Sequence, residues 1–354
     1  MPVSIVVGGQ YGSEGKGKVA LESVRADKAV TAVVRVGGPN SGHTGVRRDG
    51  KVFALRQIPA GAVDGDTLVI LPAGSYIDVD VLQREIHELG LDKDQVKISH
   101  LANVITEEHK AWEREADLQR TIGSTGSGTG AAVLGRIARN SPSFPCKAVK
   151  AEEVSALDAF VRHDVQELMR EMLRKDKRIV IEGSQGFGLS VLHANVWPKA
   201  TSRDTTAASF LSEAGLSPLD VDDIALTIRC HPIRVAGDSG PLHKEISWGA
   251  IAREAGLSHD ITELTTVTRK PRRVGTFDAA VVRDAISANC PTRIVLNHLD
   301  YVDPQVRERT ASPDAQAFVN RIEETIGRTI EWFGTSPSDI VPRDAIFAKS
   351  TRNV

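Results

Sequence analysis

The sequence predicts an α/β protein, built as one large domain over residues 1–354 around a mostly parallel central sheet. Three observations support this prediction. Short apolar runs rich in β-branched residues recur along the chain, helix-like stretches lie between them, and a glycine-rich loop follows the first run. Alternation of strands and helices is typical of a sheet whose strands run parallel.

The composition limits the classes of function. The chain has 44 Lys and Arg against 46 Asp and Glu, and the formal net charge of −2 leaves no basic excess for coating nucleic acid. Hydrophobic residues make up 41% of the chain, and no stretch approaches the roughly 20 unbroken apolar residues of a membrane helix. We therefore expect a soluble protein that has neither nucleic acid nor a membrane as its partner.

Cysteine usage and the N-terminus predict the compartment. Cys146, Cys230 and Cys290 lie far apart with no CxxC pair, so neither a disulfide framework nor a zinc cluster is expected. Residues 1–7 run directly into glycine and lack the charged start and longer apolar core of a signal peptide. These features favour a reducing cytoplasm.

Six runs are predicted as buried strands because they are short, apolar and β-rich. They are Ser4–Val7, Ala32–Val36, Thr67–Leu71, Arg178–Glu182, Ile224–Arg229 and Arg293–Leu296.

Five stretches between these runs are predicted as helices, and several of them start at an acidic or capping residue. They are Val79–Leu89, Ile105–Arg120, Glu152–Lys175, Asp278–Ala288 and Asp314–Ile326. Segment 121–145 is rich in Gly, Ser and Pro, and the regular spacing of its glycines indicates a functional loop, with disorder as the alternative.

The loop after the first strand has the composition of a phosphate site. It reads Gly8-Gly9-Gln10-Tyr11-Gly12-Ser13-Glu14-Gly15-Lys16-Gly17-Lys18 and leads into a segment that is predicted to open a helix. A strand, a glycine loop and a helix N-terminus together bind anions, because exposed N–H groups and the helix dipole converge there. Lys16 or Lys18 adds positive charge.

This loop is P-loop-like, but it is not a Walker A loop. The pattern GxxxxGK[ST] requires glycine at position 10 and Ser or Thr at position 17, where Gln10 and Gly17 stand. A tight turn without a ligand is the alternative interpretation.

A second glycine-rich cluster follows the second strand and reads Gly37-Gly38-Pro39-Asn40-Ser41-Gly42-His43-Thr44. A single histidine in such a loop is more often structural than catalytic. Its place beside a phosphate loop makes His43 a candidate acid or base.

These loops and the later segment Ile122–Gly128 resemble adenylosuccinate synthetases, whose motifs read GDEGKGK, GGxNxGHT and IGTTGxG. The resemblance continues at Glu182–Gly186, Thr201-Ser202, Thr266–Arg273, Asn297–Asp300 and Gly334–Pro337, and so covers nearly the whole chain. It implies the adenylosuccinate synthetase fold and a magnesium-dependent ligase that joins aspartate to a purine nucleotide. The short chain is similar to the compact archaeal and viral members.

One position departs most from the family pattern. The family's catalytic aspartate, which takes the proton from N1 of inosinate and helps to hold magnesium, is Ser13 here. The neighbouring motif residues remain, so decay of the site is the less favoured interpretation. Serine at this place, together with Arg229–Val235 and Glu263–Thr268, resembles the phage branch of the family. Those 2-amino-2′-deoxyadenylosuccinate synthases use dGMP on the way to 2-aminoadenine in viral DNA.

The chemistry of guanine is consistent with serine at this position. Guanine carries an amino group at C2, next to N1, where an aspartate carboxylate would crowd it. Serine leaves room, and its hydroxyl still forms hydrogen bonds. A serine hydroxyl is far too weak a base to take the N1 proton, so a water, the nucleotide phosphates or another residue must assist.

The resemblance also implies roles for individual residues. In the family reaction, O6 of the purine attacks the γ-phosphate of a nucleoside triphosphate, and the aspartate amine then displaces phosphate from C6. His43 matches the histidine that protonates or polarises the developing oxyanion, and Lys16 and Ser13 are the other catalytic candidates. Ser13 and the carbonyl of Gly42 match the magnesium ligands.

Contacts to the triphosphate are implied for Gly12, Ser13, Glu14, Gly15, Lys16, Gly17, Lys18, Gly42, His43, Thr44, Asn297, Asp300, Gly334 and Pro337. Contacts to dGMP are implied for Ser13, Asn40, Ser124, Thr125, Arg139, Gln185 and Thr201. Among these, Arg139 matches an arginine that a dimer partner supplies to the 5′-phosphate, which implies a homodimer. An arginine on a solvated helix is the alternative.

The aspartate substrate is assigned to the segment that corresponds to the family's TTGRRRR, which reads Val267–Arg273 here. Thr268, Lys270 and Arg272 are the matching contacts. Arg272 matches an arginine that clamps carboxylates, a bidentate task that suits guanidinium. Lys270 replaces an arginine and remains able to bind a carboxylate.

The base of the triphosphate is predicted from Asn297-His298-Leu299-Asp300, where family members that use GTP have TKLD. Asp300 favours guanine, whereas His298 in place of lysine removes the cation aimed at O6. The phage members resemble users of ATP or dATP, so we expect ATP, with GTP as the alternative.

The sequence thus predicts a Mg²⁺-dependent ligase that condenses dGMP with L-aspartate, driven by ATP, in the cytoplasm of a host if the protein is viral. The close alternative is an ordinary adenylosuccinate synthetase that uses inosinate and GTP. A nucleotide-binding regulator without catalysis is the rival from another class.

Overall fold

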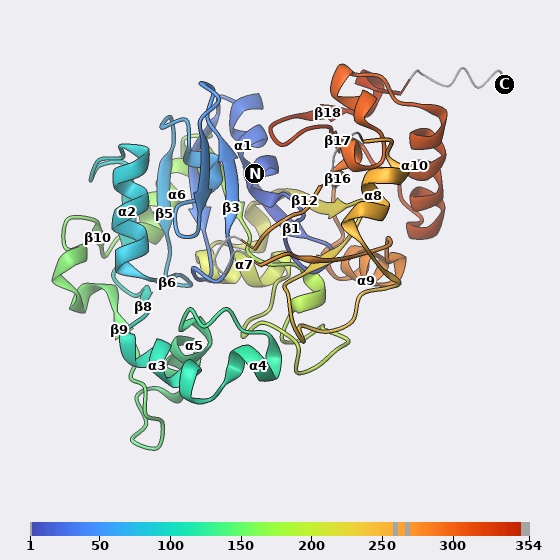
Figure 1. The fold of residues 1–354 in the computed structure, drawn as a ribbon. Helices are drawn as coiled ribbons and strands as arrows, with labels where there is room; N and C mark the ends of the chain where they lie inside the picture. The colour runs from blue at the N-terminus through green and yellow to red at the C-terminus, as the bar shows by residue number, and fades with distance from the viewer. Residues whose placement is uncertain (1, 258–260, 266–269, 348–354) are drawn as a thin grey trace.

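The computed structural model describes residues 2–257, 261–265 and 270–347. Its centre is a ten-stranded sheet in the order β10-β7-β5-β2-β11-β1-β12-β16-β17-β18 (Figure 1). Neighbouring strands pair in parallel throughout, except for the antiparallel pair β17–β18 at one edge. The predicted α/β class with a mostly parallel central sheet is confirmed.

The strands of this sheet are β1 (Val3–Gly8), β2 (Val30–Arg35), β5 (Leu68–Leu71), β7 (Val96–Ser99), β10 (Val161–Arg162), β11 (Arg178–Glu182), β12 (Val221–Arg229), β16 (Arg293–Asn297), β17 (Trp332–Gly334) and β18 (Ile340–Pro342). Smaller sheets contain β3 (His43–Val46), β4 (Val52–Leu55), β6 (Tyr76–Ile77), β8 (Asn103–Val104), β9 (Val149–Lys150), β13 (Ile233–Arg234), β14 (Glu245–Ile246) and β15 (Arg273–Gly275). All six predicted strands are confirmed.

The helices are α1 (Lys16–Ala26), α2 (Val79–Leu89), α3 (Glu107–Glu115), α4 (Leu118–Ile122), α5 (Thr129–Ala138), α6 (Val165–Arg174), α7 (Ala207–Ala214), α8 (Trp248–Glu254), α9 (Ala279–Asn289) and α10 (Pro313–Ile326). Helices α3, α4 and α5 gather at one end of the molecule, below the sheet in Figure 1. No helix within the described ranges is both long and apolar enough to span a lipid bilayer.

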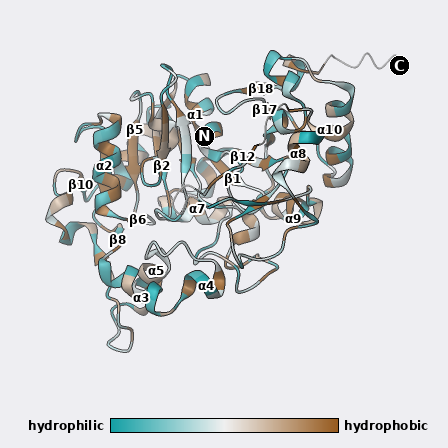
Figure 2. Cartoon of the chain, viewed as in Figure 1, coloured by the Kyte–Doolittle hydropathy of each residue, from teal (hydrophilic) through white to brown (hydrophobic). Residues whose placement is uncertain are grey.

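Helices cover both faces of the sheet, because successive side chains of a strand point to opposite faces. In β1, Val3, Ile5 and Val7 belong to a core cluster that also contains residues of α6, α7, α9 and α10. Val6 belongs instead to the cluster formed with α1. Figure 2 shows the hydrophobic residues along strands such as β5, whereas α2 alternates between hydrophobic and hydrophilic stretches. The near-continuous apolar runs seen in the sequence are the consequence of burial on both faces.

Three of the predicted helices are confirmed as α2, α9 and α10, and two predictions were wrong in part. The predicted helix Ile105–Arg120 is interrupted. Ile105 donates its backbone N–H to Ile77 at 2.8 Å, Thr106 caps α3 with its side chain, and Asp117 has a left-handed φ of 49° that separates α3 from α4. A side-chain cap fixes the residue at which a helix begins, even where the helix-like sequence pattern starts earlier.

The predicted helix Glu152–Lys175 is helical only from Val165 onward, in α6. Its first half forms two short 3₁₀ turns and then β10, which pairs in parallel with β7 at the edge of the sheet. Tertiary pairing therefore overrode the helix-like pattern of the isolated segment.

The predicted loop 121–145 contains α5, so only Gly123–Gly128 and the residues after Ala138 are loop. The carboxylate of Glu113, on α3, accepts hydrogen bonds from the N–H groups of Gly128, Gly130 and Ala131 at 2.9, 2.8 and 3.2 Å. These are the free N–H groups at the start of α5. Because the capping group comes from another helix, no local sequence signal marked this helix start.

The sheet brings the ends of five central strands together. Strands β1, β2, β11, β12 and β16 end at Gly8, Arg35, Glu182, Arg229 and Asn297. Parallel strands have their carboxyl ends at one edge of the sheet, which is the usual position of ligand sites in α/β proteins. Four of these strand ends carry a charged or amide side chain, and these side chains organise the site.

Candidate active site

The loop between β1 and α1 folds around the carboxylate of one of its own residues, Glu14. Oε1 of Glu14 accepts hydrogen bonds from the backbone N–H groups of Gln10 at 3.1 Å and Gly12 at 2.7 Å, and Oε2 lies 2.6 Å from Nζ of Lys16. Glu14 and Lys16 have side-chain exposures of 0% and 1%. A Cβ atom on Gly186 would lie 2.2 Å from Oε1 of Glu14, so only glycine leaves room for this carboxylate. Glu14 therefore serves as an internal anion that shapes the loop.

The predicted strand, glycine loop and helix N-terminus are confirmed, with α1 beginning at Lys16. Gly12, Ser13 and Gly15 all have a left-handed φ, of 91°, 57° and 90°. Gln10, which breaks the Walker A pattern, makes two hydrogen bonds to the backbone of Arg229, at 2.9 and 3.1 Å. The residue that excluded an ordinary P-loop thus ties this loop to the end of β12.

His43 is held by a buried ionic cluster. Its Nδ1 lies 2.6 Å from Oε1 of Glu182, the last residue of β11. The same oxygen accepts from Nη1 of Arg35 at 3.2 Å, and Glu182 also accepts from the N–H groups of Ala60 and Gly61 at 3.0 and 3.1 Å. Three of these four partners contact Oε1 and one contacts Oε2, and together they favour the ionised carboxylate.

The pKa values in this cluster follow from burial and charge. Burial and the neighbouring Arg35 lower the pKa of His43 to about 3, although Glu182 opposes them. Burial raises the pKa of Glu182, but His43, Arg35 and the backbone N–H of Ala60 outweigh it, and the pKa is lowered. His43 is therefore neutral. Its Nδ1 lies 2.6 Å from both Oε1 of Glu182 and Nη1 of Arg35, and its Nε2 lies 3.3 Å from Nη1 of Arg35 and 3.4 Å from Oγ of Ser41.

A second ion pair, between Arg229 and Glu263, contacts the backbone of Ser13. Nη1 of Arg229, which is 0% exposed, donates to the carbonyl of Ser13 at 3.1 Å. Nη1 and Nη2 of Arg229 also contact Glu263, at 3.2 and 2.5 Å. Burial raises the pKa of Glu263, but the neighbouring Arg229 outweighs it and lowers that pKa to about 2. The pair holds the backbone of Ser13 in its left-handed conformation.

Glu263 also anchors the segment assigned to aspartate. Oε2 of Glu263 lies 3.5 Å from Nη1 of Arg272, and its backbone carbonyl accepts from the N–H of Arg272 at 2.8 Å. Nε of Arg272 donates to the carbonyl of Leu264 at 3.1 Å. One carboxylate thus connects the arginine assigned to aspartate with the serine assigned to the purine.

A cavity of about 570 Å³ opens in front of the loop and has the size of a small-molecule site. Ten of the predicted site residues line it: Gly12, Ser13, Asn40, Gly42, Ser124, Thr125, Gln185, Thr201, Lys270 and Arg272. Thr268 lies outside the described residues. The cavity therefore unites the residues assigned to dGMP, except Arg139, with two of the three assigned to aspartate.

The other predicted site residues in the described ranges do not line this cavity. They are Glu14, Gly15, Lys16, Gly17, Lys18, His43, Thr44, Arg139, Asn297, Asp300, Gly334 and Pro337. His43 is close to the cavity wall through Gly42 and Ser41, which do line it.

Lys18, Asn297 and Asp300 form a cluster on the far side of the loop. Nδ2 of Asn297 donates to the carbonyl of Glu14 at 2.7 Å, and its Oδ1 is buried without a partner in the described part of the chain. A Cβ atom on Gly334 would lie 2.0 Å from that oxygen, which requires glycine there. Nζ of Lys18 donates to the carbonyl of Ser336 at 2.7 Å, and burial lowers the pKa of Lys18 to about 8.

Arg139 directly follows α5 and does not line the cavity. It is exposed and has a left-handed φ of 52°. Leu134 and Ile137 on the same helix are 43% and 70% exposed. The structure of one chain therefore does not bring Arg139 into the site.

The sequence interpretation missed the roles of four charged residues: Arg35, Glu182, Arg229 and Glu263. Three of them end a buried apolar strand, and a charged residue in that position is a signal that a sequence can provide. Glu182 and Arg229 lay inside motifs that were recognised, but nothing local indicated which side chains they contact.

Known proteins resemble this chain over nearly its whole length. The adenylosuccinate synthetase family model matches residues 5–153 and 146–311. The adenylosuccinate synthetase of Methanococcus aeolicus is 35% identical over 346 residues, which are 95% of this chain and 97% of that protein. The adenylosuccinate synthetase of Pyrococcus horikoshii is 35% identical over 345 residues, which are 95% and 96% of the two chains.

Two solved structures share the fold. The succinoaminodeoxyadenylate synthetase of cyanophage S-2L, bound to dGMP and to dATP as an energy donor, superposes with a TM-score of 0.79 at 30% identity. The match covers 96% of this chain and 95% of that one. The fully ligated adenylosuccinate synthetase of Plasmodium falciparum superposes with a TM-score of 0.81 at 19% identity over 97% of this chain and 99% of that one, a likeness of fold alone. The adenylosuccinate synthetase fold expected from the motifs is confirmed.

Proposed function

The chain belongs to the adenylosuccinate synthetase family of carbon–nitrogen ligases, and from this premise we propose that it joins L-aspartate to dGMP in a reaction driven by ATP. The products are 2-amino-2′-deoxy-N⁶-succinyladenylate, ADP and phosphate. The proposed reaction belongs to the synthesis of 2-aminoadenine deoxynucleotides.

The observation that carries this proposal is Ser13 on the cavity wall. Its backbone is held by Arg229, and its side chain stands at the position of the family's aspartate base. The short hydroxyl leaves room for the 2-amino group of guanine, which a carboxylate at this position would crowd. The cyanophage S-2L enzyme, solved with dGMP, supports the same substrate.

In the proposed reaction, O6 of guanine attacks the γ-phosphate of ATP, and the aspartate amine then displaces phosphate from C6. The anionic phosphates raise the pKa of His43 when they approach Nε2, because an opposite charge favours the protonated ring. His43 then donates from Nε2 to the phosphates while Glu182 holds Nδ1–H. The N1 proton of guanine leaves to water or to a phosphate oxygen, because Ser13 is too weak a base to take it.

Oxygen donors suited to Mg²⁺ border the cavity. Ser13 offers a hydroxyl and Gly42 a backbone carbonyl, and both residues line the cavity. The carboxylate of Glu14 is not available, because two backbone N–H groups and Lys16 already bind it. Mg²⁺ held by Ser13, Gly42 and the triphosphate would neutralise charge on the phosphates.

The cluster on the far side of the loop favours ATP over GTP. Asp300, the residue expected to read guanine, pairs through Oδ2 with Nη2 of Arg307 at 2.7 Å. Desolvation and Arg229 hold the pKa of His298 well below its usual range, so His298 offers no cation to O6 of guanine. The dATP bound to the cyanophage enzyme supports an adenine nucleotide as well.

Arg139 and the exposed apolar side chains of α5 support a homodimer in which Arg139 reaches the 5′-phosphate in the partner's site. If so, chains carrying Arg139→Leu should regain activity when mixed with chains carrying His43→Ala, because each hybrid dimer has one intact site. Activity that stays absent in hybrid dimers shown to form would contradict a shared site.

The archaeal relatives favour a second candidate function, the ordinary adenylosuccinate synthetase reaction with inosinate and GTP. One assay separates the candidates: the purified protein with Mg²⁺, aspartate, ATP or GTP, and either dGMP or IMP. We expect phosphate release and a succinyl product from dGMP with ATP. Turnover of IMP alone would establish the second candidate, and nucleotide binding without any product would establish a regulator.

A further inference from the structure

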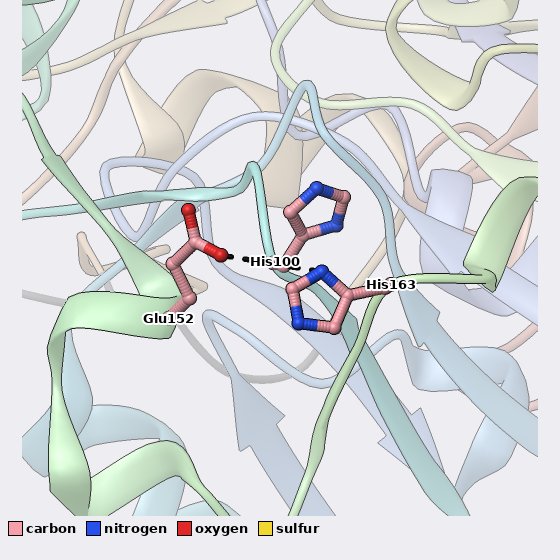
Figure 3. A group of neighbouring side chains, drawn as sticks. All are labelled: His100, Glu152 and His163. Carbon is pink, nitrogen blue, oxygen red and sulfur yellow. Dashed lines mark ion pairs between the residues drawn. The ribbon is translucent and has the colours of Figure 1, made fainter.

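The side chains of His100, Glu152 and His163, all of types that bind metal ions, lie close together (Figure 3). They lie beside β7 and β10, and β10 is an edge strand of the central sheet. His100 directly follows β7, His163 directly follows β10, and Glu152 lies in the 3₁₀ turn Ala151–Glu153. None of the three lines the cavity.

The backbone fixes how these residues meet. In the parallel pair β7–β10, Ser99 is registered with Arg162, and the N–H of His100 donates to the carbonyl of Arg162 at 3.0 Å. His100 and His163 are therefore neighbours at the ends of adjacent strands. The N–H of Glu152 lies 3.4 Å from the carbonyl of His100, which brings the turn to the same place.

The side chains are close enough to share one ion. The centroids of the two imidazole rings lie 4.3 Å apart. One nitrogen of each ring and one carboxylate oxygen of Glu152 all lie within 4.8 Å of one another, and in the described ranges no other group of three such side chains meets that condition. Ligand atoms of a tetrahedral zinc ion lie about 3.4 Å apart, so modest side-chain rotations would close the site.

Direct hydrogen bonds do not explain this arrangement. Nδ1 of His163 lies 4.0 Å from Oε2 of Glu152, beyond hydrogen-bond distance. Nδ1 of His100 is inaccessible to solvent and has no hydrogen-bond partner in the described residues. The partner that the carboxylate does have is Lys150, whose Nζ lies 2.5 Å from Oε1.

We propose that His100, Glu152 and His163 bind a divalent transition-metal ion, Zn²⁺, with water as the fourth ligand. Two imidazole nitrogens and one carboxylate oxygen are donors that zinc accepts in tetrahedral geometry, whereas Mg²⁺ and Ca²⁺ favour oxygen ligands alone. The ion joins β7, β10 and the 3₁₀ turn. Because β10 has two residues and pairs with β7 alone, the ion stabilises a weak edge of the sheet.

Titration calorimetry of the tag-free, chelator-treated protein with ZnCl₂ tests this site without any enzyme assay. We expect one Zn²⁺ per chain with a dissociation constant on the order of 1–10 μM, and a higher unfolding temperature when the ion is present. Co²⁺ should give the intense visible bands of a four-coordinate ion.

Variants identify the ligands. His163→Gln, at a side chain that is 74% exposed, should weaken Zn²⁺ binding by at least about 10-fold without affecting folding, and so should His100→Gln. The matched control is His87→Gln, at an exposed histidine of α2 outside the cluster, which should bind Zn²⁺ like the unmodified protein. Lys150→Gln should bind it more tightly, because it frees the carboxylate of Glu152 and removes a nearby positive charge.

Absence of stoichiometric Zn²⁺ binding would overturn the proposal. Equal binding by His163→Gln and the unmodified protein would do the same, as would a Co²⁺ spectrum of a six-coordinate aqueous ion only.

Discussion

The glycine loop at residues 8–18 and the part of the cavity wall that is proposed to hold the purine are built in opposite ways. In the loop and the strand ends behind it, Glu14, Lys16, Arg35 and Glu182 are almost fully buried and paired with one another or with backbone N–H groups. On the proposed purine side, the candidate contacts Ser13, Ser124, Thr125 and Gln185 are uncharged side chains that are partly exposed.

This difference shows where the site can change. Every buried charge in the loop has a partner, so removing one partner leaves an uncompensated charge, at a typical cost of about 3–5 kcal/mol in stability. Replacing a neutral side chain on the cavity wall leaves no uncompensated charge. Ser13 lies at the boundary, because its backbone belongs to the loop and its side chain to the wall. A substitution there is therefore able to change the substrate while the loop persists.

The largest expected effect is on the loop side, at His43. We expect His43→Ala to bind dGMP but to lose turnover by about 10²-fold or more, the usual range for a lost proton donor. Steady-state kinetics with dGMP, ATP and aspartate measures this. Near-normal turnover would remove His43 from the mechanism and with it the functional contrast between the two regions.

Ser13→Asp tests the wall side. Aspartate tolerates the left-handed φ of 57° at this position better than most residues do, so the loop should persist. The carboxylate restores a base for N1 but crowds the 2-amino group of guanine. We expect the ratio of kcat/KM for IMP to that for dGMP to rise by about 10²-fold.

Ser13→Asn is the matched control for this switch, because it has the size of aspartate and no basic carboxylate. It should lose dGMP turnover without gaining IMP turnover. An unchanged ratio in folded, nucleotide-binding Ser13→Asp would show that position 13 does not select the purine.

Glu263→Gln tests the ion-pair connection between the two regions, in which Glu263 contacts both Arg229 and Arg272. It keeps the shape of the side chain but removes the charge that holds Arg229 and Arg272. We expect KM for aspartate to rise by about 10-fold, equivalent to about 1.4 kcal/mol, with a smaller change in kcat.

The matched control for Glu263→Gln is Glu245→Gln. Glu245 pairs with Arg273, the residue next to Arg272, but its side chain is 45% exposed. Surface pairs of this kind contribute little, so its kinetics should not change. Equal effects of the two substitutions would contradict a specific link through Glu263.

A separate effect is expected on stability rather than on catalysis, as a pH dependence from the buried histidines. Burial and Arg35 lower the pKa of His43 to about 3, and burial and Arg229 lower that of His231 to about 4. Because both folded pKa values lie below the unfolded value of about 6.5, the unfolded chain binds more protons as pH falls. Stability should therefore fall below pH 6.5, by up to about 1.4 kcal/mol per pH unit for each group.

Urea unfolding between pH 7 and pH 5 measures this slope. His231→Asn should reduce it, whereas His87→Gln, at an exposed position, should not. A slope that is the same in all three proteins would show that His231 is not held neutral in the fold.

Part of the site could be predicted from the sequence because its residues are contiguous. The loops at Gly12–Lys18 and Gly37–Thr44 each contain several candidate site residues within a few positions, and the structure brings both to the same edge of the sheet. Arg139 stays a prediction, because the motif that suggests it is not matched by a place in the cavity of one chain.

The sequence by itself determined the α/β class, the unit of strand, glycine loop and helix at the start of the chain, and the place of Ser13 within it. Those features follow from local rules: alternating burial along strands, glycine at left-handed positions, and the order of motifs along the chain. Only the tertiary structure decided that Glu182 holds His43 across 139 positions, that Arg229 and Glu263 hold Ser13, and that Glu113 caps α5. These partners meet because parallel strands bring their ends to one edge of the sheet and helices pack beside them. That packing decides which polar groups, distant in the sequence, become hydrogen-bond partners.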